Sequence, residues 1–179
     1  MIKRLSNSIL ALLAASALLC AGNALAANKA GTYVQGHYAE FDDSDNDGFG
    51  IAGSWMVRED IRLFGEYTTM EFSDMAVLGG GYRLFADDQW YFELGASYQD
   101  FDLDDGGPAV HGLVDYEPIP DLTLTGKLEY LMYDEVDDQL VVGLGVDYAF
   151  TPEFSAFFSY EEQTDISANM GRLGVRYAF

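Results

Sequence analysis

Apolar and polar residues alternate with a period of two along most of the chain. From Leu140 to Phe150 every second residue is large and apolar, whereas most residues between them are small or charged. Successive side chains of a strand point to opposite faces, so this alternation predicts a strand with one apolar face. The same pattern recurs from Trp90 to Tyr98 and from Leu122 to Tyr130. Strands that separate two different environments are therefore expected.

Turn signals divide the chain into ten such segments. The predicted strands cover residues 31–41, 48–58, 61–71, 75–85, 89–101, 108–117, 121–133, 139–150, 154–162 and 168–179. Their connections alternate between tight turns, at 58–60, 86–88, 118–120 and 151–153, and acidic loops that are mostly longer. Each strand is near the ~9–11 residues that a tilted strand needs to cross a bilayer, and alternating turn lengths are typical of membrane barrels. We predict an all-β fold: a closed, antiparallel, up-and-down transmembrane β-barrel of ten strands, with eight strands as the alternative.

Aromatic residues on the apolar faces form two groups according to strand parity. Odd strands place a tyrosine near the acidic loop: Tyr38, Tyr67, Tyr98, Tyr130 and Tyr160. Even strands place an aromatic near the tight turn: Trp55, Tyr82, Tyr116, Tyr148 and Tyr177. Amphipathic rings favour the headgroup boundary, so two girdles are predicted. A soluble β-sandwich also alternates, but one aromatic per strand, placed by parity, is harder to obtain in that fold.

Lysine and arginine residues within the strands fall on the face opposite the apolar one. A basic residue that faces lipid at the bilayer midplane costs ~2–4 kcal/mol, which disfavours Lys and Arg on the outer face. The predicted lumen charges are Arg62, Glu66, Arg83, Glu93, Asp115, Glu117, Lys127, Glu129, Asp147, Arg172 and Arg176. Desolvated charges need partners, so we expect ion pairs that fill a narrow lumen rather than a wide aqueous pore.

The first 26 residues have the features of a signal peptide. Lys3 and Arg4 precede an apolar stretch from residue 9 to 19, and Ala24-Leu25-Ala26 is a small-x-small cleavage pattern. The stretch is shorter than the ~20 residues of a spanning helix. Cys20 does not follow a small residue, so it does not fit a lipoprotein signal. We expect cleavage after residue 26 and a barrel domain over 27–179.

The last strand carries a family resemblance. Leu173, Val175, Tyr177 and the terminal Phe179 alternate, and this set resembles the C-terminal assembly signal of bacterial outer-membrane barrels. The resemblance implies an outer-membrane location, and the secretion and barrel-assembly machinery as partners. Residues 27–179 resemble the small barrels related to the membrane domain of OmpA and to OmpX, in a short-loop variant with ten strands.

The charge balance narrows the classes of partner. Nine Lys and Arg stand against 30 Asp and Glu, giving a net charge of −21, which argues against nucleic acid. Most of the acids, Glu161 among them, lie in or beside the predicted outer loops. Such a rim attracts cations, either divalent ions that bridge to lipopolysaccharide phosphates or permeant ions. Membrane lipid and lipopolysaccharide are thus expected partners.

Two short motifs resemble ligand sites. Asp43, Asp45 and Asp47 begin an EF-hand pattern, but its twelfth position is Ser54, where a bidentate Glu is required. At most weak Ca²⁺ or Mg²⁺ binding at the outer loops is expected, and no other cofactor. The glycine motif at 48, 50 and 53 lies within a strand, so we interpret it as spacing for barrel curvature rather than a dinucleotide site.

Catalytic residues have little support. His37 and His111 are the only histidines, and no motif combines either with a nucleophile. The leading hypothesis is a non-enzymatic outer-membrane protein that is structural or forms a narrow, cation-favouring pore. The alternatives are a surface adhesion or cation-binding module, and a lipid A-modifying or proteolytic barrel enzyme.

Overall fold

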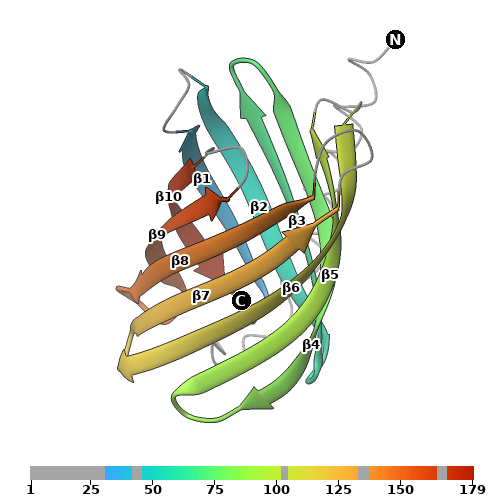
Figure 1. Ribbon diagram of the computed structural model, residues 1–179. Coiled ribbons are helices and arrows are strands. Elements are labelled where there is room, and N and C mark those ends of the chain that lie inside the picture. The colour runs from blue at the N-terminus through green and yellow to red at the C-terminus, as the bar shows by residue number, and fades with distance from the viewer. Residues whose placement is uncertain (1–30, 42–45, 102–104, 133–137, 165–168) are drawn as a thin grey trace.

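The computed structural model is a barrel of ten antiparallel strands (Figure 1). It describes residues 31–41, 46–101, 105–132, 138–164 and 169–179. The strands are β1 (Tyr33–Phe41), β2 (Asp47–Arg58), β3 (Ile61–Met70), β4 (Asp74–Ala86), β5 (Trp90–Phe101), β6 (Asp105–Ile119), β7 (Leu122–Leu131), β8 (Gln139–Ala149), β9 (Phe154–Gln163) and β10 (Asn169–Ala178). The predicted fold class is confirmed, with ten strands rather than eight.

The barrel closes where the first strand meets the last. Each strand pairs with its neighbour in sequence, and β1 pairs with β10 from Tyr33 opposite Ala178 to Phe41 opposite Met170. Closure leaves no strand with a free edge, which suits a chain that cannot hydrogen-bond to water in lipid. The strands tilt strongly around the barrel in Figure 1. Below, the end with the four short connections is called the tight-turn end, and the opposite end is called the loop end.

The largest differences from the predicted boundaries occur in β6. It begins at Asp105 rather than at 108, because the turn-prone residues Gly106 and Gly107 pair with β5. It also continues to Ile119, so the turn lies later than the predicted 118–120. Asp121 in this turn has a φ of 72°, a left-handed conformation that Asp tolerates better than most residues.

The predicted signal peptide, residues 1–26, lies outside the described residues. Within the described ranges, no helix is long and apolar enough to cross a membrane.

The two faces of the barrel have opposite chemistry. The outer face is apolar, with Leu78 71% and Leu144 68% exposed. The inner face carries buried polar groups, among them Glu93 and His111. This inside-out arrangement is typical of a barrel that stands in lipid.

The side chains of the aromatic residues predicted to form girdles lie on the outer face of the barrel. At the tight-turn end, Trp55, Tyr82 and Tyr148 are more than half exposed. At the loop end, three tyrosines donate hydrogen bonds to an aspartate across their own hairpin. The pairs are Tyr38 with Asp47 at 2.9 Å, Tyr67 with Asp74 at 2.7 Å and Tyr130 with Asp138 at 2.5 Å. Each bond ties an amphipathic ring to a loop-end carboxylate, which suits a headgroup boundary.

Candidate pore lumen

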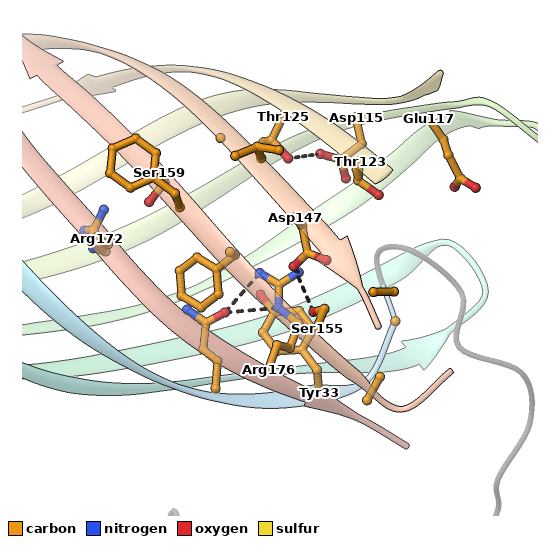
Figure 2. Close-up of a pocket in the computed structure, with 18 of the residues that line it drawn as sticks. Tyr33, Asp115, Glu117, Thr123, Thr125, Asp147, Ser155, Ser159, Arg172 and Arg176 are labelled. Atoms are coloured by element: carbon orange, nitrogen blue, oxygen red, sulfur yellow. Dashed lines mark hydrogen bonds and ion pairs between the residues drawn. The ribbon is translucent and has the colours of Figure 1, made fainter. Parts of the chain in front are cut away.

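A cavity of about 530 Å³ occupies the tight-turn half of the lumen (Figure 2). Turn residues such as Asp121 and Glu153 line it, so it is a vestibule at this end of the barrel. Seven acids and three bases line the vestibule, an excess of four negative charges: Glu66, Asp115, Glu117, Asp121, Asp147, Glu153 and Glu161 against Lys127, Arg172 and Arg176. An acid-rich cleft with low-dielectric walls concentrates cations.

Arg176 is held on one side of the vestibule by four groups. Its guanidinium pairs with Asp147 at 3.0 Å and donates to Gln35 Oε1 at 3.0 and 3.1 Å. Its Cζ lies 4.2 Å from the ring centroid of Tyr33 and 5.2 Å from that of Phe157. The carboxylate, the amide oxygen and the aromatic faces together form a binding site for a planar cation.

An ionic partition crosses the lumen above the vestibule. Arg172 contacts Glu66 at 3.2 Å and Glu161 at 2.9 Å, and Lys127 contacts Glu161 at 2.6 Å and Glu129 at 3.6 Å. Glu66, Lys127, Glu161 and Arg172 line both the vestibule and a second cavity of about 140 Å³. The partition therefore lies between two cavities within one lumen.

Glu161, which was expected in or beside an outer loop as part of the acidic rim, belongs instead to this partition in the lumen. It lies in β9, where alternation with Tyr160 turns its side chain inward. An acid near a predicted strand end resembles a loop acid, which explains the error. The positive charges of Arg172 and Lys127 offset the cost of burying the Glu161 carboxylate.

A second ion-paired group surrounds Glu93. Arg62 binds the Glu93 carboxylate through two nitrogens, at 2.8 and 2.5 Å, and the Tyr91 hydroxyl donates to it at 2.5 Å. His111 Nε2 lies 3.5 Å from Glu93, and its Nδ1 lies 4.0 Å from Glu129. The two groups thus form one nearly continuous charged band across the lumen.

Glycines on the inner face make room for these large side chains. A Cβ at Gly81 would overlap the carboxyl group of Glu93, and one at Gly50 would overlap the ring of His37. Gly50 belongs to the glycine motif at 48, 50 and 53. The space beside it accommodates a lumen side chain, and a role of the motif in barrel curvature stays a prediction.

An apolar layer lies at the loop end of the lumen. Met70, Met75, Met170 and Ala39 are at most 7% exposed and form one contact cluster. Phe41, Val77 and Phe101 pack against it while partly buried. Hydrophobic constrictions can stop conduction by dewetting. Nothing in the alternation of the sequence distinguishes this layer from the charged part of the lumen, since Met70 has the same strand parity as Arg62 and Glu66.

The remaining predicted lumen charges are also found on the inner face. Asp115 is 8% exposed and accepts a hydrogen bond from the Thr125 hydroxyl at 2.6 Å. Arg83 lies with its Cζ 5.1 Å from the ring centroid of Tyr91. Glu117 lines the vestibule.

The predicted cation site at the outer loops is only partly within the described residues. Asp47 accepts the hydrogen bond from Tyr38, whereas Asp43 and Asp45 lie outside the described residues. Among the residues that are described, no group of three or more His, Cys, Asp or Glu is placed to hold a metal ion. The weak outer-loop site stays a prediction.

The surroundings of His37 do not form a catalytic relay. His37 Nε2 lies 3.1 Å from the Thr68 hydroxyl and 3.4 Å from Glu66, so both groups meet the same ring nitrogen. A relay would need the acid on the other nitrogen. The Thr68 hydroxyl donates to Glu66 at 3.2 Å instead of to the histidine.

The predicted assembly signal lies on the strand that closes the barrel. Leu173, Val175 and Tyr177 are 60%, 57% and 41% exposed on the outer face of β10. The ring of Phe179 stacks on Tyr177 with centroids 6.0 Å apart. Docking of this strand on assembly machinery stays a prediction.

Comparison with known proteins identifies the class of barrel. The sequence model for the outer membrane protein beta-barrel domain matches residues 11–179. Among solved structures, the KdgM porin is 14% identical with a TM-score of 0.56, covering 82% of this chain and 99% of that chain. The NanC porin is 15% identical with a TM-score of 0.57, covering 83% of this chain and 100% of that chain. At such identities the likeness shows the fold alone. No curated protein matches the sequence.

Proposed function

We infer that this chain, which belongs to the outer membrane protein beta-barrel domain family, forms a narrow pore that favours cations. The protein is an integral β-barrel of the bacterial outer membrane with a porin-like fold. The observation that best supports a cation preference is the excess of four acids in the vestibule. The three bases of the vestibule are each paired with an acid of the same cavity. None of them therefore presents a free positive charge to a permeant ion, and the net field of the cavity is negative.

The layered lumen supports a small conductance. The vestibule and the second cavity share the partition of Glu66, Lys127, Glu161 and Arg172, so an ion that moves between them passes these charged side chains. Beyond the second cavity lies the apolar layer around Met75. Charged and apolar constrictions in series limit the rate of passage.

The same charges argue against an anionic permeant. One KdgM porin structure is a complex with disordered oligogalacturonate, a polyanion. An anion in the present vestibule would meet Asp115, Glu117 and Asp147. Like charge in a low-dielectric cleft repels such a ligand. We therefore propose cations as the permeant class.

The proposal also includes the surroundings of the barrel. The exposed aromatic rings at both ends suit contact with lipid headgroups, including lipopolysaccharide at the loop end. The alternating outer face of β10 suits recognition by barrel-assembly machinery during insertion. Chelating divalent ions and measuring release from lipopolysaccharide-containing vesicles tests the first contact.

Planar-bilayer recording tests the pore. The refolded protein is expected to give small single-channel currents whose reversal potential in a KCl gradient has the sign of cation preference. The double variant Glu66→Ala/Arg172→Ala removes a charge pair from the partition at no net change in charge. We expect its conductance to rise severalfold, because the shared boundary of the two cavities is shortened.

The control is an ion pair outside the lumen. Arg58 and Asp60 pair at 3.2 Å at the tight-turn end, where the Arg58 side chain is exposed and the Asp60 side chain is partly exposed. The double variant Arg58→Ala/Asp60→Ala should leave conductance and selectivity unchanged. Absence of channel events in both the folded parent protein and the partition variant, or a reversal potential of anion-preferring sign, would contradict the proposal.

A further inference from the structure

The vestibule contains a buried carboxylate that forms no direct ion pair with a described side chain. Asp115 is 8% exposed and lines the cavity. Its hydrogen-bond partner is the Thr125 hydroxyl, and none of the ion pairs among the described residues includes it. A buried charge without a counter-ion is costly, so a cation that enters the vestibule gains by pairing with Asp115.

The opposite side of the vestibule shows which cations the cavity accommodates. There the guanidinium of Arg176 already lies between Asp147, Gln35 and the ring of Tyr33. Figure 2 shows the Asp115–Thr125 pair set apart from the group around Arg176. The structure therefore contains one acidic position filled by a tethered organic cation and a second, Asp115, that no side chain fills.

Open space adjoins Asp115. In the register of β7, β8 and β9, Gly145 lies between Thr125 and Ser159, and it lines the cavity together with Gly143. A Cβ at Gly145 would lie 3.4 Å from the Thr125 Cβ and 3.7 Å from the Ser159 Cβ, which is ordinary contact. A side chain at this position would fit the backbone and project into the space that a ligand would use.

The distribution of charge favours an extended cation over a compact one. In the part of the chain that the structure describes, no three acids or histidines converge as metal ligands. The acids of the vestibule are instead dispersed over β3, β6, β8, β9 and two turns, and the hydroxyl groups of Thr123, Thr125, Ser155 and Ser159 line the same cavity. Dispersed carboxylates and hydroxyl acceptors match several ammonium groups joined by a slender apolar chain.

We propose that the vestibule binds a linear organic polycation, such as a polyamine, which enters from the tight-turn end and places one ammonium group on Asp115. The inference rests on the proposed cation-favouring pore, since it names the class of cation that the vestibule admits. A slender chain of methylene groups packs against Tyr33, Phe157 and the glycines of β8, while its ammonium groups meet the acids. Inorganic cations lack this apolar contact and bind less tightly.

Calorimetric titration of the refolded full barrel in detergent at fixed ionic strength tests the site, with spermidine and Mg²⁺ as the two probes. Spermidine is expected to bind and Mg²⁺ to bind at least about tenfold more weakly. Asp115→Asn keeps the acceptor for Thr125 but removes the charge, and should weaken spermidine binding about tenfold or more, since hydrogen bonds to charged groups are the strong ones. Gly145→Val retains every charge but fills the space, and should also weaken binding.

The matched control is Glu71→Gln, which removes the same charge from an exposed residue at the loop end. It should bind spermidine as the parent protein does. Equal binding of spermidine and Mg²⁺, no spermidine binding, or equal losses for Asp115→Asn and Glu71→Gln would each overturn the site. Gel mobility of the folded barrel verifies that each variant has assembled.

The outcome separates this inference from the pore itself. Cation-selective current without spermidine binding would leave the pore and remove the site. Spermidine binding that depends on Asp115 and Gly145, in a protein that passes no current, would support the site and remove the pore.

Discussion

Replacing Glu93 by glutamine should destabilise the barrel strongly. The Glu93 residue is 2% exposed, and its carboxylate accepts two hydrogen bonds from Arg62 and one from Tyr91. Glutamine preserves the shape but leaves the guanidinium of Arg62, itself only 9% exposed, without its counter-charge. Breaking a buried pair by removing one partner costs ~3–5 kcal/mol, so the free energy of unfolding should fall by about that amount.

A double variant separates the pair from the general effect of substitution. Arg62→Met/Glu93→Gln removes both charges, and with them the cost of desolvating either one. Replacing a buried pair by groups of similar volume is often neutral, so the double variant should lose much less than the sum of the two single variants. The difference between the sum and the double variant measures the coupling energy.

Urea unfolding of the refolded barrel in lipid vesicles, followed by tryptophan fluorescence and by gel mobility, measures these free energies. The more solvent-accessible pair of Arg58 and Asp60 provides the comparison, because surface pairs contribute ~0–1 kcal/mol. Losses that simply add, or a Glu93→Gln variant that loses no more than Arg58→Met, would refute the role assigned to the buried pair.

Two further predictions concern space and hydrogen bonding. Gly81→Ala should destabilise the barrel in the same assay because its Cβ would overlap the carboxyl group of Glu93, whereas Gly171→Ala, with no atom within 4 Å of the added Cβ, should be close to neutral. Tyr130→Phe should cost ~0.5–1.5 kcal/mol through loss of the hydrogen bond to Asp138, and Asp138→Asn, which retains an acceptor, should cost less. Equal effects of the two substitutions in either comparison would contradict the geometry.

The faces of the strands could be predicted from the sequence because lipid and lumen impose the same period of two on every strand. All eleven charges that parity assigned to the interior are on the inner face, including Arg83 and Asp147. The number of strands could be predicted as well, because turn signals separate one alternating segment from the next. Errors arose where parity and turn chemistry disagreed, as at Gly106 and Gly107, where backbone pairing with β5 overrode the local preference for a loop.

Partners across the lumen could not be predicted. Glu66 and Arg172 are 106 residues apart, and they meet only because the first and last strands close the barrel. The apolar layer is a related case. Parity places Met70, Met75 and Met170 on the inner face, but only closure brings β3, β4 and β10 together at one end.

Depth within the barrel decides what an inward acid does, and depth depends on strand tilt and stagger rather than on sequence spacing. Glu93 and Asp115 look alike in the sequence, since each is an inward acid between apolar outward neighbours. The stagger places Glu93 against Arg62 and Asp115 against the open vestibule. One carboxylate is therefore neutralised within the fold, whereas the other is available to a cation from outside. Substitution of Glu93 should thus reduce stability, and substitution of Asp115 should reduce binding with little loss of stability.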